Sequence, residues 1–553
     1  MASHVRPTRR GLIAAVGAAG ITAGLGGRAT AAPAATGQAG SHRASFGPFT
    51  VGPDDPRYAE LTTGVNQRWV GRPDAVRLPG TTAHVVQAVQ DAVRTGRRIS
   101  VRGGGHCLAD FVYHPDVRVV IDMSGMHAVG WDADMGAFMV EAGATLLNVY
   151  DTLYKGWGVT IPGGLCYSVG VGGHVQGGGF GLLSRRHGLT VDHLHAVEVV
   201  TVDAGGTARA VVATRDPRDP NHDLWWGHTG GGGGNFGVVT RYWFRSPGAR
   251  GSDPRALLPV PPREVLVHVM ALPWSDLDEA GFTRFVGNVG RWYEANRDPE
   301  SPYTGLSGSI TLSHKSAGTV NIVTQIDADR PDAERMLGDY LNALTDGVGA
   351  PARTPADATA PLVKPRRLPW LRATRYLGTV SPDVTAPVQR SAHHSTHMRT
   401  GVPDEHVAKM YRHLTLDGYT NRTSMVVVNF MGGRVDAVAP TDTATFQRDS
   451  IFKLLYQSVW QDPAEDALHT AWARDFYRDV YAATGGVPVP GEATNGCYIN
   501  YPDTAAGDAD SNTSGVPWAS LYYGGNLPRL RQVKARHDPR GIFRHAQSIP
   551  TGG

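Results

Sequence analysis

PGGLCYSVGVGGHVQGGGFG, residues Pro162–Gly181, is the stretch that decides the fold. Two more glycine-rich segments flank it, RGGGH at Arg102–His106 and GGGGGNFG at Gly230–Gly237. Loops of this kind let backbone N–H groups approach phosphate oxygens closely. One such loop is weak evidence, because glycine also simply forms turns. Three of them in one segment favour a large cofactor that carries phosphate.

The last of these segments contains a literal GxGxxG, at Gly232, Gly234 and Gly237. A dinucleotide site of the Rossmann type requires a helix directly after that motif. VVTRYWF follows instead, and its β-branched and aromatic residues predict a strand. No lysine follows a glycine anywhere, so a Walker A loop is also excluded.

Hydrophobic periodicity predicts α/β alternation up to about Arg245. Valines at helical spacing predict a helix after Thr81 or Thr82 that stops at Gly96, followed by a strand in ISVRGGGH. From about Gly248, runs such as GSITLSHKSAGTVNIVTQID and TSMVVVNFMGG predict antiparallel strands with helices between them. We therefore expect a first domain over residues 50–248, a second over 249–491, and a segment over 492–553 that returns to the first.

The N-terminal 31 residues have a twin arginine, Arg9-Arg10, a weakly apolar stretch and small residues near Ala31. This pattern predicts a twin-arginine signal peptide over 1–31 and therefore secretion. Residues 32–49 are rich in Ala, Gly and Ser and are expected to be flexible. The apolar stretch is too weak for a membrane anchor.

Composition narrows the function classes. The chain has 53 Lys+Arg and 50 Asp+Glu, and removing the four arginines of residues 1–31 leaves 49 basic residues. The chain is nearly neutral and has no basic patch, so its charge gives no indication of nucleic-acid binding. Its three cysteines are too few for a disulfide framework.

The glycine-rich motifs, YINYPD at 498–503 and the C-terminal YYGGNLPRLRQVKARHDPRGIFRHAQSIP together resemble the berberine bridge enzyme-like FAD-linked oxidases, of the vanillyl-alcohol oxidase class. The resemblance runs from about residue 60 to the C-terminus. It implies an α+β fold, in which a PCMH-type FAD-binding domain of two subdomains is joined to a substrate domain. That second domain would have a large antiparallel sheet backed by helices.

The resemblance also implies FAD held by two covalent bonds. The matching residues are His106, for the 8α carbon, and Cys166, for C6, whereas Cys107 has no family role. His174 matches a histidine near the polar edge of the flavin, and Val169 matches a position that controls oxygen access. The other matching cofactor residues are Arg102, Gly103, Gly104, Gly105, Gly170, Gly172, Gly173, Gly177, Gly178, Gly179, Gly234, Asn235, Phe236, Gly237, Val238, Asn500 and Asn526.

The resemblance places the catalytic base at Tyr501, with Tyr498 as the next candidate. CYINYPD reads as a strand, which would put these two tyrosines on opposite faces. As a phenolate, Tyr501 would remove the hydroxyl proton while hydride leaves the carbon. The approximate register of the family places Asn429 and Lys453 near the substrate, and Lys453 would favour an ionised tyrosine.

HHSTH, His393 to His397, raises the question of a metal. No nearby acid or cysteine completes a zinc set and there is no HExxH, so we expect no metal and a loop or helix of the second domain.

The sequence therefore predicts an exported FAD oxidase that transfers hydride from an alcohol to the flavin and forms H2O2 with O2. A glycosylated or polyketide-type natural product is the first expectation for its substrate. A carbohydrate oxidase, an oxidative cyclase and a non-catalytic drug-binding protein with the same fold are the alternatives. We expect no nucleic-acid or membrane partner, and the oligomeric state stays open.

Overall fold

The first predicted helix forms as its sequence requires. In the computed structural model, which describes residues 46–349, 362–379 and 388–551, helix α2 spans Thr82–Thr95. The Thr81 hydroxyl accepts a hydrogen bond from the backbone of His84, and Gly96 ends the helix in the left-handed conformation at φ 65°. Both predicted boundaries of this helix are confirmed.

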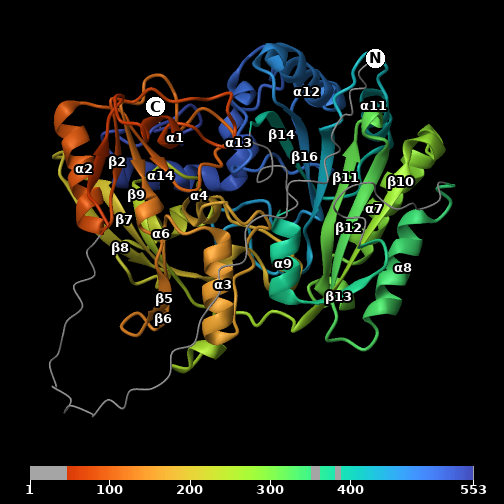
Figure 1. Ribbon diagram of the computed structural model, residues 1–553, viewed down its shortest axis with the longest axis horizontal. Coiled ribbons are helices and arrows are strands. Elements are labelled where there is room, and N and C mark those ends of the chain that lie inside the picture. Colours follow the sequence, from red (N-terminus) through yellow and green to blue (C-terminus); the bar gives the residue numbers. More distant parts are fainter. Residues whose placement is uncertain (1–45, 350–361, 380–387, 552–553) are drawn as a thin grey trace, which may run out of the picture. The chain divides into compact units, whose positions relative to one another are not determined.

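Two small sheets carry the glycine-rich loops (Figure 1). The first has the strand order β1-β2-β4-β3. Its strands are β1 (Phe49–Val51), β2 (Ala75–Leu78), β3 (Ile99–Arg102) and β4 (Val119–Asp122). The second has the order β5-β6-β9-β7-β8. Its strands are β5 (Val129–Asp132), β6 (Ala137–Glu141), β7 (Leu194–Val202), β8 (Ala208–Thr214) and β9 (Val238–Phe244). Strand β9 directly follows the GxGxxG, so the strand predicted there in place of a Rossmann helix is confirmed.

Helices connect these strands. Thr145 caps α3 (Leu146–Trp157) through its hydroxyl, and the chain then runs irregularly through Cys166 to Gly170, which begins α4 (Val171–Gln176). The further helices of this part are α1 (Tyr58–Leu61), α5 (Ser184–His187) and α6 (His222–Gly227).

The large sheet has seven strands in the order β13-β10-β12-β11-β15-β16-β14, and every neighbouring pair is antiparallel. Its strands are β10 (Glu264–Pro273), β11 (Leu306–Ser313), β12 (Thr319–Asp327), β13 (Arg366–Pro369), β14 (Arg390–Met398), β15 (Ser424–Phe430) and β16 (Phe452–Trp460). The expected antiparallel sheet is therefore present.

One face of this sheet is covered by helices, with which it forms a continuous apolar core. These helices are α7 (Glu279–Ala295), α8 (Ala333–Thr345), α11 (Asp404–Leu414) and α12 (Asp466–Val480). The opposite face turns toward the two small sheets. Val265, Val267 and Val269 of β10 belong to the same apolar core as residues of those sheets. Helix α9 (Trp370–Thr379) joins the two parts, since Trp370 packs on Tyr150 and Tyr154 of α3.

The C-terminal segment contains helices α13 (Trp518–Tyr523) and α14 (Leu527–His537). It returns to the glycine-rich part as expected: the Tyr523 hydroxyl donates to the carbonyl of Gly231, and Lys534 Nζ donates to that of Asn235. A short strand was also expected here, but residues 492–551 contain only an isolated bridge from Thr494 to Met398, together with turns, irregular chain and helices.

The predicted signal peptide, 1–31, and most of the segment 32–49 lie outside the described residues, although β1 begins at Phe49. The domain limits at 50–248, 249–491 and 492–553 stay predictions. Within the three described ranges, no helix combines the length and the apolar character that a membrane crossing needs.

Candidate active site

A cavity of about 540 Å³ lies between the glycine-rich loops and the open face of the large sheet. Nineteen of the predicted site residues line it. They are Arg102, Gly103, Gly104, Gly105, His106, Cys166, Val169, Gly170, Gly172, Gly173, His174, Gly234, Asn235, Gly237, Val238, Asn429, Tyr498, Asn500 and Tyr501. Segments far apart in the sequence thus meet around one space.

Six predicted residues do not line the cavity: Gly177, Gly178, Gly179, Phe236, Lys453 and Asn526. The three glycines form a turn that packs on neighbouring side chains, since a Cβ there would lie 2.2 to 2.6 Å from Asn500, Thr445 or Thr190. Phe236 is a core residue with 1% exposure. Asn526 is a structural residue, because its amide donates to the carbonyls of Pro440, Thr443 and Ala444.

Two glycine-rich loops cross backbone against backbone at the cavity wall. A Cβ on Gly104 would lie 2.4 Å from the nitrogen of Gly170 and 2.6 Å from the oxygen of Ser168. A Cβ on Gly170 would lie 2.2 Å from the nitrogen of Gly104. Real Cβ atoms do not approach backbone atoms this closely, so the crossing requires glycine on both sides.

The two predicted anchors share a neighbour at this crossing. His106 Nε2 lies 2.8 Å from the Ser168 hydroxyl oxygen, and Cys166 Sγ lies 3.7 Å from the same oxygen. His106 and Cys166 are both half-buried and both line the cavity. The fold thus brings an imidazole and a thiol, 60 positions apart in the printed sequence, to one wall.

The residues at this wall fit a flavin nucleotide. A Cβ on Gly173 would meet no protein atom within 4 Å, although Gly173 lines the cavity, so its bare backbone faces open space. Gly103 is almost equally open, with its nearest neighbour at 4.0 Å. Bare backbone of this kind lets a large, flat, phosphate-bearing group approach closely.

His174 lies behind this wall as a neutral base. Its Nε2 accepts a hydrogen bond of 3.2 Å from the backbone N–H of Gly164. Burial lowers the pKa of His174 to about 4, and Lys453 contributes to the same shift. At neutral pH this imidazole is therefore uncharged.

The segment CYINYPD is a turn and not the predicted strand, because the N–H of Tyr501 donates to the carbonyl of Tyr498 at 2.9 Å. The predicted separation of the two tyrosines onto opposite faces is therefore wrong. Their rings meet edge to face, with centroids 5.1 Å apart. The side-chain amide of Asn500 donates to the Tyr498 hydroxyl at 3.2 Å. Burial raises the pKa of Tyr498 to about 12, which keeps it a neutral phenol.

Lys453 lies behind these aromatic rings. It is fully buried, and its Nζ is 3.2 Å from the ring centre of Phe180, 3.6 Å from that of Tyr498 and 4.6 Å from that of Tyr501. Its Nζ has no hydrogen-bond partner among the described residues. Burial lowers the pKa of Lys453 well below its usual value.

The register of the large sheet sets Lys453 in a row of polar side chains. Ser309 pairs with Asn429, Asn429 with Lys453, and Lys453 with His397, across β11, β15, β16 and β14. The HHSTH motif is thus part of strand β14, and the predicted loop or helix is wrong. His393 and His397 still share a face, since alternate residues of a strand point the same way. In the described parts of the chain no group of side chains could hold a metal ion.

Sequence reasoning missed Ser168 and most of the sheet side chains that line the cavity. The latter are Ser307, Ser309, His393, Val427, Phe430, Leu455 and Gln457. Their signal was the alternation of polar residues within otherwise apolar strands, as in LSGSITLS of β11. The sequence alone does not say which side of such a strand faces a cavity.

Comparison with known proteins gives consistent matches. The family model described as FAD binding domain matches residues 73–210, and the model described as berberine and berberine like matches residues 497–550. The chain is 47% identical to the aclacinomycin-N/aclacinomycin-A oxidase of Streptomyces galilaeus, over 99% of both chains.

Two solved structures are similarly close. One is CrmK, a flavoenzyme involved in the shunt product recycling mechanism in caerulomycin biosynthesis, with 48% identity and a TM-score of 0.87 over 91% of this chain and 99% of that chain. The other is the glycopeptide hexose oxidase DBV29 complexed with teicoplanin, with 46% identity and a TM-score of 0.85 over 92% of this chain and 99% of that chain.

Proposed function

The chain belongs to the berberine bridge enzyme-like FAD-linked oxidases, and from this premise we propose that it oxidises an alcohol on a glycosylated or polyketide-type natural product. As a member of that family it is an FAD-linked oxidase that acts on CH–OH groups with O2 as the acceptor. When bound, FAD accepts a hydride from the substrate carbon and is reoxidised by O2, which yields H2O2.

One observation carries the proposal: a single cavity has His106 and Cys166 on one wall and polar side chains of the large sheet on another. His106 and Cys166 would hold the flavin through two covalent bonds, and the crossing loops at Gly104 and Gly170 would carry its phosphates. Val169, which also lines the cavity, would leave O2 more room than a bulkier side chain.

Tyr501 would take the hydroxyl proton of the substrate. It lines the cavity, whereas the raised pKa of Tyr498 argues against ionisation of that second tyrosine. A phenolate at Tyr501 and an ammonium at Lys453 stabilise each other, since Nζ lies 4.6 Å from the ring centre. Moving the phenol proton to the buried amine would create this ion pair from two neutral groups.

A carbohydrate oxidase is the second candidate. It is favoured by the polar row of Ser309 and Asn429 at the cavity and by the similarity to a glycopeptide hexose oxidase. Export through the twin-arginine pathway is proposed from the N-terminal sequence alone.

The test is anaerobic reduction of the protein-bound flavin by a panel of antibiotic glycosides, aglycones and free oligosaccharides, followed by peroxide measurement in air. Reduction by glycosides, and only weak reduction by free sugars, supports the tailoring function. Fast reduction by free oligosaccharides would instead establish the carbohydrate oxidase. A flavin that no alcohol in the panel reduces would contradict both.

A further inference from the structure

The face of the large sheet that lines the cavity carries two separate polar rows. The first, here called the reaction row, is Ser309, Asn429 and Lys453, and it lies beside Tyr501. The second, here called the distal row, is Gln457 and His393, which pair across β16 and β14 and both line the cavity. The mechanism proposed above uses only the reaction row.

In the row between them, the two side chains that line the cavity are apolar, and Thr311 and Ser395, which flank them in that row, do not line it. Val427 of β15 and Leu455 of β16 pair with each other and line the cavity. Gln457 is four residues from Lys453 along β16, and a strand rises about 3.2 to 3.4 Å per residue, so the two rows lie about 13 Å apart. Along the strands, the side chains that line this wall of the cavity are therefore first polar, then apolar, then polar again.

The distal row has hydrogen-bonding capacity that the protein does not use. His393 is 8% exposed, and its Nδ1 has no partner among the described residues. Burial lowers the pKa of His393 to about 3, helped by His394 and Arg68, so the ring is neutral and can both donate and accept. The amide of Gln457 makes no side-chain hydrogen bond within the described ranges either.

Polar side chains this enclosed are almost always paired, so His393 and Gln457, which line the cavity without a hydrogen-bond partner among the described residues, point to a ligand group. We propose that Gln457 and His393 recognise a hydrogen-bonding group at the far end of the substrate, about 13 Å from the oxidised alcohol. The section between packs on Val427 and Leu455 and is apolar. This inference rests on the proposed function and narrows its substrates to elongated, amphipathic glycosides whose aglycone ends in a hydroxyl, carbonyl or amide.

The test compares methyl, octyl and 8-hydroxyoctyl glucosides, which share one sugar and differ in the far end. Binding is measured from the perturbation of the flavin absorption spectrum, and oxidation from anaerobic flavin reduction. Wild type should prefer the 8-hydroxyoctyl over the octyl glucoside roughly tenfold, the effect of one well-made hydrogen bond.

Gln457→Leu and His393→Leu should each lower this ratio toward one and leave the constants for methyl glucoside unchanged. His393→Gln should restore part of it, which guards against a variant that merely folds poorly. Met425→Leu is the matched control, because Met425 pairs with Gln457 on β15 but does not line the cavity.

The outcomes separate the two proposals. A preference that depends on Gln457, without flavin reduction by these glucosides or by any alcohol of the panel above, supports the distal row and contradicts the proposed oxidation. Flavin reduction with no preference in wild type, or with the same preference in Gln457→Leu and His393→Leu, overturns the distal row and leaves the oxidase function standing. An equal loss for methyl and 8-hydroxyoctyl glucosides also overturns it.

Discussion

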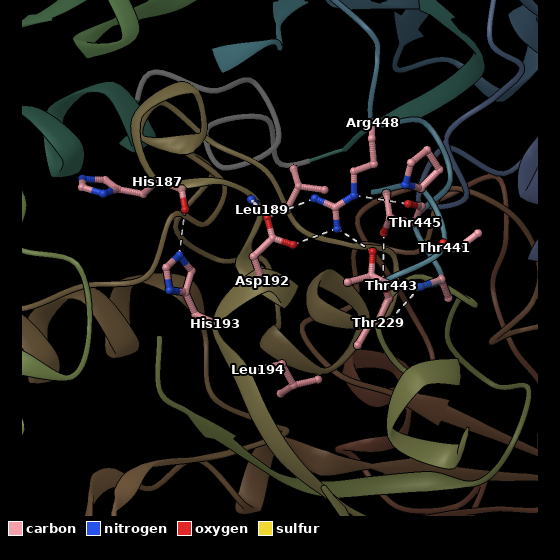
Figure 2. A network of polar contacts seen from close by, with 12 residues as sticks. His187, Leu189, Asp192, His193, Leu194, Thr229, Thr441, Thr443, Thr445 and Arg448 are labelled. Atoms are coloured by element: carbon pink, nitrogen blue, oxygen red, sulfur yellow. Dashed lines mark hydrogen bonds and ion pairs between the residues drawn. The ribbon is translucent and has the colours of Figure 1, made fainter. Parts of the chain in front are cut away.

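Arg448 and Asp192 form a buried, two-pronged ion pair that joins the loop before β16 to the chain before β7 (Figure 2). Arg448 donates to both carboxylate oxygens, at 3.0 and 2.7 Å, and also to the Thr443 hydroxyl. Only 1% of the arginine side chain and 6% of the aspartate side chain are exposed. The pair thereby ties the strand that carries Lys453 to the glycine-rich part.

We expect Arg448→Met to lower the free energy of unfolding by about 3 to 5 kcal/mol, because it leaves a buried carboxylate without its partner. Arg448→Met combined with Asp192→Leu should recover most of the loss. Arg335→Met, which removes an exposed pair with Asp339, should cost at most about 1 kcal/mol. Chemical denaturation measures all three, and a cost for Arg448→Met as small as that of Arg335→Met would contradict the argument.

The two predicted anchors, His106 and Cys166, can be tested by the release of flavin on denaturation. Acid-precipitated wild type should stay yellow. His106→Ala and Cys166→Ala should each keep the flavin through the other bond, whereas the double variant should release it. Ser168→Ala should retain flavin but slow its attachment, since Ser168 is the neighbour of both side chains. Release of flavin from the denatured wild type would refute the double attachment.

Substitutions of Gly173 and Gly104 should distinguish a glycine that the cofactor requires from a glycine that the fold requires. Gly173→Ala should fold with unchanged stability and bind less flavin, because its methyl group would meet only the cavity. Gly104→Ala should instead destabilise the protein itself, because its Cβ would lie 2.4 Å from the Gly170 nitrogen. Gly130→Ala is the control, with open space at its Cβ and no cavity contact. Thermal unfolding and the ratio of bound flavin to protein measure both effects; normal flavin content in Gly173→Ala would argue against this placement.

Lys453→Met should stabilise the protein while it impairs catalysis. Removing a buried, unpaired amine relieves an unfavourable desolvation and should raise the free energy of unfolding by about 1 to 3 kcal/mol. Without the neighbouring amine to take up its proton, the tyrosine ionises less readily, so the acidic limb of the kcat profile should move to higher pH. Tyr501→Phe should lower kcat roughly 10²- to 10⁴-fold, and Tyr498→Phe much less. An unmoved pH profile in Lys453→Met would show that the amine is only structural.

Acid should destabilise the fold through its buried histidines. Burial lowers the pKa of His228 to about 4 in the folded protein, from about 6.5 in the unfolded chain. The stability that neutral His228 contributes is therefore fully present above pH 6.5 and is lost as the pH falls toward 4, at about 1.4 kcal/mol per pH unit. Between pH 6.5 and pH 4, the unfolding free energy of His228→Gln should therefore fall less steeply with decreasing pH than that of wild type, by about 1.4 kcal/mol per pH unit. Equal slopes in both proteins would contradict the assignment.

Local signals predicted the elements best. The caps of α2, the strand after the GxGxxG and the antiparallel pair β11–β12 follow from residues close together in the sequence. The prediction of a strand for CYINYPD failed because alternating apolar residues also occur in buried turns. Here the backbone hydrogen bond from Tyr501 to Tyr498 closes a turn. The prediction of a loop or helix for HHSTH failed because its polar residues do not resemble a buried strand. A strand with such residues becomes plausible only once it is known that one of its faces lines a cavity.

By itself, the sequence determined the family and the glycine-rich loops, and it predicted His106 and Cys166 as the flavin anchors, because these residues lie in motifs that resemble those of the family. Only the tertiary structure decided that Ser168 lies between these two side chains, that Lys453 lies beneath the tyrosines, and that Gln457 and His393 share the cavity wall. Those relationships depend on sheet register and on contacts between loops that lie far apart in the sequence. A one-residue change of register would turn every one of the sheet side chains to the opposite face.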